Sequence, residues 1–210
     1  KLFLCKLKSN LTSMNFTFRL LFTLLLLNSC IPKKSEAPID FTLESDSSIN
    51  LRDYGTPITT IPILSHPTTE IANEVGNDAI VGISIEKAQQ NLDQVISVDE
   101  VVLNDKKVQL IIDYPLKKPA SFTLENEKGF TRRELILAIQ QKYKQVYKEE
   151  EESAATKTIP MNRREGLSNR NETNGKYGIW GHDLTDLYLT DVEVYKDSKG
   201  IESLILYIDS

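Results

Sequence analysis

Cysteine is almost absent from this sequence: Cys5 and Cys30 are the only two among 210 residues. No thiol follows Cys30, so the long segment after it can form no internal disulfide, no cysteine-based zinc site and no cysteine nucleophile. A domain in that segment has to gain its stability from packing alone, even in an oxidising compartment.

Acidic residues are absent from the start of the chain, where Glu36 is the first carboxylate. Residues 1–29 instead contain four cations: Lys1, Lys6, Lys8 and Arg19. Without these four, 21 Lys and Arg remain against 30 Asp and Glu, a formal charge of −9. This balance disfavours nucleic acids and anionic lipid surfaces as partners.

Long apolar runs and familiar catalytic motifs are also absent. The run from Leu20 to Leu27 has only eight residues, whereas a membrane-spanning helix needs about 20. No phosphate-binding loop, dinucleotide fingerprint, GxSxG or HExxH motif occurs. The sequence therefore predicts no cofactor and indicates no particular reaction.

The short apolar run is typical of an export signal, because Arg19 precedes it and Asn28, Ser29 and Cys30 follow it. With Leu-Asn-Ser before Cys30, the stretch resembles the lipobox of bacterial lipoproteins. The resemblance implies cleavage before Cys30, a diacylglycerol on its thiol and usually a third acyl chain, which together anchor a protein stably. The alternatives are an ordinary signal peptide of a secreted protein and a buried apolar segment.

Four parts are expected along the chain. Met14 is a natural start, so residues 1–13 are expected to be an upstream extension outside the fold. The signal peptide, the lipidated Cys30 with its polar tether, and a single domain then cover 14–29, 30–38 and 39–210. Ile31 is not the Asp that retains some lipoproteins in the inner membrane, so the resemblance favours the outer membrane, facing the periplasm.

Alternating apolar residues and turn signals predict an α+β domain whose antiparallel sheet is built of hairpins. Pro57 and Pro62 make 56–64 an edge strand or an extended loop. The turn 104–107 predicts a hairpin between 98–103 and 108–113. The other expected elements are strands at 39–45, 79–85 and 121–124, a short helix at 86–96, and a second hairpin of 184–195 with 201–208.

The strongest local pattern begins at Thr131, which forms a T-x-x-E capping box with Glu134. Apolar residues then recur on one face of a helix: Leu135, Ile139, Tyr143, Val146 and Tyr147. We predict a long amphipathic helix from about residue 132 to about 153, packed on the sheet. A long polar loop is expected at 154–176.

Four consecutive glutamates, Glu149 to Glu152, end this helix, although a helix C-terminus repels carboxylates. Three interpretations are open. The end is solvated, with Lys144 and Lys148 paired nearby; or it docks the basic residues of the following loop; or it binds a metal ion, with Glu149 and Glu152 on a shared face as weak candidates. The basic residues in question are Lys157, Arg163, Arg164 and Arg170.

The segment 174–184 contains the only tryptophan, one of the two histidines and three glycines. One interpretation is a polar ligand pocket, with Arg170, Asn171, Tyr177, Trp180, His182 and Asp183 as its candidate residues. His182 is a candidate general base. Its carboxylate would be Glu150 or Asp186, because Asp183 directly beside it is poorly placed to orient it. The alternative is that Tyr177, Ile179 and Trp180 close the end of the core.

From Gly129 to Ser210 the chain also resembles an uncharacterised domain without an assigned activity, which implies no mechanism. Three functions are therefore weighed. A non-enzymatic envelope lipoprotein that binds a protein or a small ligand is expected. A hydrolase using His182 and a purely structural lipoprotein are the alternatives.

Overall fold

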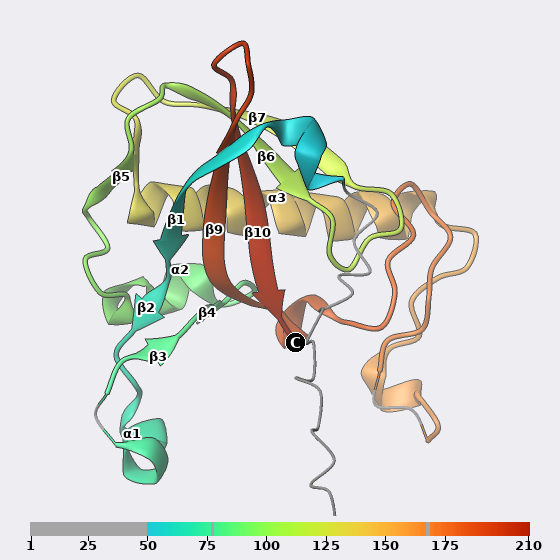
Figure 1. The fold of residues 1–210 in the computed structure, drawn as a ribbon. Coiled ribbons are helices and arrows are strands. Elements are labelled where there is room, and N and C mark those ends of the chain that lie inside the picture. The colour runs from blue at the N-terminus through green and yellow to red at the C-terminus, as the bar shows by residue number, and fades with distance from the viewer. Residues whose placement is uncertain (1–49, 77, 167–168) are drawn as a thin grey trace, which may run out of the picture. The chain divides into compact units, whose positions relative to one another are not determined.

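A β-sheet crossed on one face by a long helix organises the described part of the chain (Figure 1). The computed structural model describes residues 50–76, 78–166 and 169–210, all within the unit Ser45–Ser210. The expected extension, signal peptide, lipidated Cys30, tether and strand at 39–45 lie outside the described residues. The mixture of helix and sheet confirms the predicted α+β class. No helix in the described ranges is long and apolar enough to cross a bilayer.

The main sheet has the strand order β1-β9-β10-β6-β7, and β4 also pairs with β9. The pairs β9–β10 and β6–β7 are antiparallel, whereas β10 and β6 run parallel in the middle of the sheet. This parallel pair was not predicted. The strands are β1 (Thr56–Pro62), β4 (Ile83–Ser84), β6 (Lys107–Ile112), β7 (Ala120–Glu125), β9 (Tyr188–Lys196) and β10 (Glu202–Asp209).

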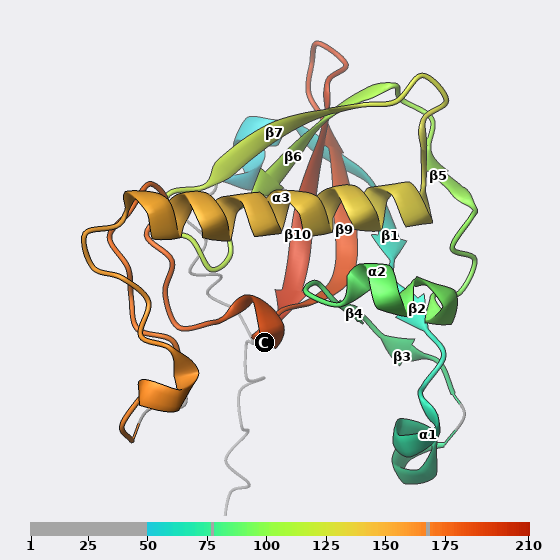
Figure 2. The ribbon, with the colours of Figure 1, turned by 180° about the vertical axis from the view of Figure 1, so that it is seen from behind.

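The long helix α3 (Arg132–Ser153) forms as predicted. The Thr131 hydroxyl accepts the Glu134 N–H at 3.2 Å, and the Glu134 carboxylate accepts the Thr131 N–H at 2.9 Å, which completes the capping box. The helix lies behind the sheet in Figure 1 and in front of it in Figure 2. Its buried face meets the inward side chains of the strands, among them Leu135, Ile139, Tyr143 and Val146 on the helix and Leu110, Val192 and Leu204 on the sheet.

The sheet face turned away from α3, called here the open face, carries a second, small apolar cluster of Ile111, Tyr195 and Ile205. Tyr54, at the end of the 3-10 helix η2 (Leu51–Tyr54), packs against this cluster. Most of the apolar core therefore lies between the sheet and α3, and the open face is largely polar.

The predicted hairpin between 98–103 and 108–113 is wrong. Strand β5 (Val101–Leu103) pairs with β8 (Phe130–Thr131), while β6 pairs with β7 and β10. Strand β6 buries side chains on both of its faces, so it takes a central position with a partner on each side. Strand β5 buries only Leu103 and stays at the periphery.

The remaining predictions hold in part. The expected strand at 79–85 is split at Gly82 into β3 (Ile80–Val81), which pairs with β2 (Leu64–Ser65), and β4, which pairs with β9. Gly82 has a backbone φ of 95°, a conformation that residues other than glycine rarely adopt. The edge strand β1, the strand β7 and the hairpin β9–β10 are confirmed. The short helix expected at 86–96 is replaced by α2 (Ala88–Asn91) and η3 (Leu92–Gln94). Helix α1 (Thr69–Val75) was not predicted. The remaining elements are η4 (Met161–Arg163) and η5 (Leu184–Asp186).

Candidate functional site

The segment 154–182, called here the strap, runs from the end of α3 back to the sheet (Figures 1 and 2). Residues 167 and 168 within it are not described. Three of the four glutamates that end α3 bind the strap, each through different groups. The predicted polar loop is therefore attached to the end of the helix near both of its own ends, at Thr158 and at Gly175 and Lys176.

Glu150 makes the central attachment, because its side chain is fully buried at 0% exposure. One carboxylate oxygen accepts the backbone N–H of Gly175 at 2.7 Å. The other oxygen accepts the N–H of Tyr177 at 2.7 Å and of Gly178 at 3.1 Å. Three backbone donors converging on one carboxylate form an anion-binding nest.

Gly175 is required by the closeness of this contact. A Cβ atom on Gly175 would lie 2.6 Å from the carbonyl oxygen of Glu150 and 2.8 Å from its carboxylate carbon. Any larger residue would therefore push the strap away from the end of the helix.

The nest keeps Glu150 ionised. Burial raises the pKa of its carboxyl group, but hydrogen bonds from the Thr173 hydroxyl and from the backbone N–H groups of Tyr177, Gly175 and Gly178 outweigh burial, so the net pKa is lowered. The same donors offset the repulsion that a carboxylate meets at a helix C-terminus.

Glu149 binds the strap through side chains. Its carboxylate accepts hydrogen bonds from Lys176 Nζ at 2.8 Å, from the Tyr177 hydroxyl at 2.6 Å and from Gln145 Nε2 at 2.7 Å. These donors lower the pKa of Glu149 to about 2. The hydroxyl of Tyr177, one of the candidate pocket residues, is therefore bound to the end of α3.

Glu151 and Glu152 have different partners: Glu151 binds the strap, whereas Glu152 lies near a lysine of the helix. The Glu151 carboxylate accepts both the hydroxyl and the N–H of Thr158, at 2.9 and 3.3 Å. Glu152 lies 3.8 Å from Lys148 at the exposed surface, as the solvated interpretation expected. No group of three or more His, Cys, Asp or Glu side chains suited to a metal ion occurs among the residues described.

The strap docks on the glutamates, but not through the arginines that the sequence suggested. Arg164 instead makes a bidentate pair with Asp183, at 2.6 and 2.9 Å, with the Arg164 side chain only 3% exposed. Arg170 Nε lies 3.8 Å from the same carboxylate. Two guanidinium groups therefore neutralise Asp183.

Arg170 and Asn171 tie together neighbouring turns of the strap. Arg170 donates to the Ile179 carbonyl at 3.1 Å and to the Thr158 hydroxyl at 2.5 Å. The Asn171 side chain accepts the N–H of Ile159 at 2.7 Å and donates to the Lys157 carbonyl at 3.1 Å. Both predicted pocket residues thus direct their polar groups into the strap itself.

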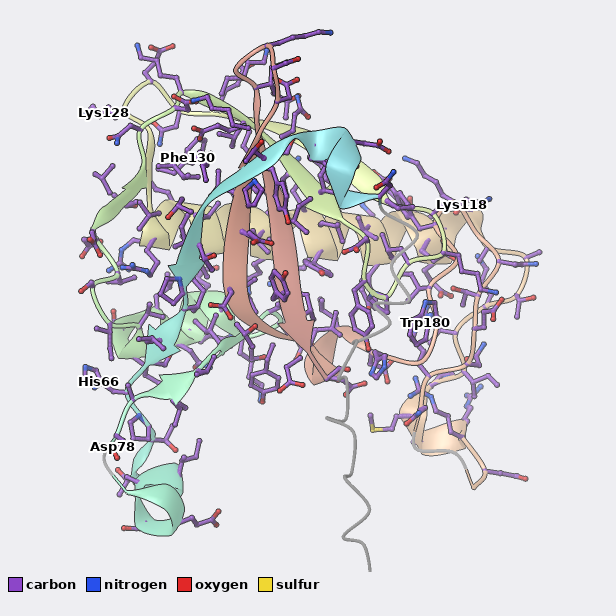
Figure 3. The ribbon with its side chains drawn as sticks, viewed as in Figure 1. His66, Asp78, Lys118, Lys128, Phe130 and Trp180 are labelled. Carbon is purple, nitrogen blue, oxygen red and sulfur yellow. The ribbon has the colours of Figure 1, made fainter. Side chains whose placement is uncertain are left out.

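Trp180 and His182 lie apart from these contacts and form an aromatic cluster with Tyr114. The ring centroids are 5.4 Å apart for Tyr114–Trp180, 5.5 Å for Tyr114–His182 and 5.8 Å for Trp180–His182. All three residues are half-buried. Figure 3 labels Trp180 on the strap.

The aromatic cluster stands on a firmly held base. The Trp180 N–H donates to the carbonyl of Pro115, the residue after Tyr114, at 3.2 Å. The Tyr143 hydroxyl, at the centre of α3, donates to the Tyr114 carbonyl at 2.9 Å. The Tyr147 hydroxyl donates to the His182 carbonyl at 3.0 Å. The three rings are therefore positioned by the core of the domain.

None of the carboxylates considered as partners for His182 contacts its ring within the described ranges. Asp183 is bound by arginines, Glu150 lies in the nest, and Asp186 accepts the Asp183 N–H at 2.8 Å to cap η5. The site thus offers a half-exposed aromatic surface more readily than an acid–base pair.

Tyr114 was not foreseen as a member of the site. The turn signal of Asp113-Tyr114-Pro115 marks the end of β6, but its contact with Trp180 depends on how the strap folds back. Comparison of the chain with protein-family models, curated proteins and solved structures gives no match. The function has to be argued from the site alone.

Replacing Glu150 tests the nest. Glu150→Gln is expected to lower the free energy of unfolding by about 3 kcal/mol, because an amide nitrogen would face backbone N–H groups and leave a buried donor without an acceptor. Urea denaturation measures the loss. Glu152→Gln, in the same run of glutamates but exposed, is the matched control and should change stability by less than about 0.5 kcal/mol. Equal losses in both variants would contradict this role of Glu150.

Acid should loosen the strap. Glu149 and Glu150 both have lowered pKa values in the folded chain, so their contribution is fully present above the unfolded value, about 4.5, and is lost as the pH falls through the folded values. For Glu149 this window extends down to about pH 2. Trp180, the only tryptophan, reports the change by fluorescence. Glu149→Gln should reduce the pH dependence of stability in this window, and an unchanged slope would refute the assignment.

Proposed function

We propose that this chain is a lipid-anchored protein of the cell envelope and a non-enzymatic interaction module that binds its partner at the aromatic cluster. The anchor is supported by the order Arg19, Leu20–Leu27, Asn28-Ser29-Cys30. These residues lie outside the described part. The proposed location is the outer membrane, facing the periplasm.

The observation that carries the binding role is the partial exposure of three clustered rings, Tyr114, Trp180 and His182, that the core of the domain holds in place. Trp and Tyr dominate the energetics of protein interfaces, because each buries a large area and loses little conformational entropy. Rings already fixed against one another lose still less on binding. The polar residues around them are bound to the strap, so they hold the rings in place.

A hydrolase would need a group that activates or orients His182, and the nearby carboxylates serve other contacts. A purely structural lipoprotein would have no use for a half-exposed cluster of aromatic rings. The binding module is therefore the function that the described contacts favour.

Mutation of the proposed acyl acceptor tests the anchor. Cys30→Ser should abolish labelling by radioactive palmitate and move the protein from the membrane fraction to the soluble fraction, because no other thiol follows it. Cys5→Ser is the matched control and should leave both properties unchanged. A Cys30→Ser protein that is still labelled and membrane-bound would contradict the proposed lipidation.

Site-specific photo-cross-linking tests the binding role. Trp180→p-benzoyl-phenylalanine, introduced in cells that make the protein, should give a discrete cross-linked product on irradiation. Gln89→p-benzoyl-phenylalanine, at an exposed position of α2, should not give that product. Tyr114→Ala combined with the Trp180 probe should weaken the product. No product from Trp180, or the same product from both probe positions, would overturn the proposed site.

A further inference from the structure

The open face of the sheet concentrates negative charge beside exposed tyrosines. Asp191 and Glu193 alternate with the buried Val192 on β9, so both carboxylates lie on the open face. On β10, Asp209 follows the inward Ile208 and is exposed to solvent on the same side as the two carboxylates of β9. Figure 3 views the molecule with this face toward the reader.

Asp191, Glu193 and Asp209 are three carboxylates that contribute to the negative charge of the open face. None of the three forms an ion pair within the part of the chain that the structure describes. By contrast, two other carboxylates of the sheet have basic partners: Glu125 pairs with Lys107 at 2.8 Å and Glu202 with Lys196 at 3.1 Å.

Tyrosine side chains lie next to these carboxylates on the open face. The hydroxyls of Tyr195 and Tyr207 both donate to one oxygen of Glu193, at 2.9 and 3.1 Å, which fixes the carboxylate in position. The rings of Tyr188 and Tyr207 remain 47% and 49% exposed. Tyr207 lies opposite Asp191 in the strand register, and Tyr188 lies opposite Asp209.

The acidic face is continuous with the aromatic cluster. The Tyr114 hydroxyl forms a hydrogen bond of 2.8 Å with the hydroxyl of Ser210, the residue after Asp209. Asp113, half-buried at the end of β6, directly precedes Tyr114. One surface therefore runs from Glu193 along the strands to the rings of Trp180 and His182.

Carboxylates and exposed aromatic rings together recognise cationic side chains, through ion pairs and cation–π contacts. Asp191 and Glu193 are two residues apart on one strand, or about 7 Å. That spacing matches alternate side chains of an extended peptide. Nucleic acids and anionic lipids would be repelled by this surface.

We propose that the open face, defined by Asp191, Glu193, Asp209, Tyr188 and Tyr207, binds an extended segment of a partner protein that carries Arg or Lys at alternate positions; this assignment rests on the proposed role as an interaction module. The carboxylates pair with the cations, and the exposed tyrosine rings cover their aliphatic stems. The aromatic cluster receives the part of the segment beyond the strands.

The test uses the full chain in non-ionic detergent and a fluorescein-labelled peptide of six Arg-Thr repeats, followed by fluorescence anisotropy. The wild-type chain should bind it, and more weakly as salt rises. The triple variant Asp191→Asn, Glu193→Gln, Asp209→Asn should weaken binding at least tenfold. The matched control, Glu74→Gln, Asp93→Asn, Glu165→Gln, removes the same charge from exposed positions elsewhere and should change binding less than twofold.

Equal weakening in the two triple variants would overturn the proposal, because net charge alone would then explain binding. Absence of peptide binding to the wild-type chain would overturn it as well. Tyr207→Ala keeps every carboxylate and should still weaken binding severalfold, which keeps the test decisive if the first triple variant fails to fold. Photo-cross-linking at Trp180 does not use this peptide. A failure of the proposed interaction role can therefore be distinguished from a failure of the proposed cationic partner.

Discussion

The carboxylate of Glu150, buried at the end of α3, is the interaction on which the candidate site depends. A charge in that position is costly unless hydrogen-bond donors surround it. The backbone of Gly175, Tyr177 and Gly178, folded back over the helix end, supplies three such donors. The charge therefore requires the strap to dock, and the docked strap places Trp180 and His182 beside Tyr114.

The docking of the strap determines which polar side chains around the candidate site are engaged in hydrogen bonds. Hydrogen bonds with groups of the strap engage Glu149, Glu151, Arg170 and Asn171. Arg164, which belongs to the strap, pairs with Asp183 just beyond it. The aromatic cluster stays partly exposed beside the strap, and Tyr188, Tyr207 and Asp209 stay exposed on the open face of the sheet. A rigid surface of rings and unpaired carboxylates suits recognition, because little conformational entropy remains to be lost on binding.

The sequence predicted what depends on neighbours along the chain. The capping box at Thr131 and the apolar stripe of α3 are local, and so is the turn of the C-terminal hairpin; all three appear as expected. Strand β5 was assigned to the nearest β-rich segment, whereas the burial of β6 on both faces decides the pairing. Among four identical glutamates, nothing in the sequence distinguishes Glu150, because its burial arises only when a distant glycine approaches it.

The most direct measurement of the central claim is hydrogen exchange at the backbone N–H groups that bind Glu150. If the buried carboxylate holds the strap, the N–H groups of Tyr177 and Gly178 should exchange as slowly as that of Tyr143 in the core of α3, through global unfolding alone. Exchange at the rate of the exposed Asn162, while Tyr143 stays protected, would show that the strap detaches without unfolding the domain and would contradict the account.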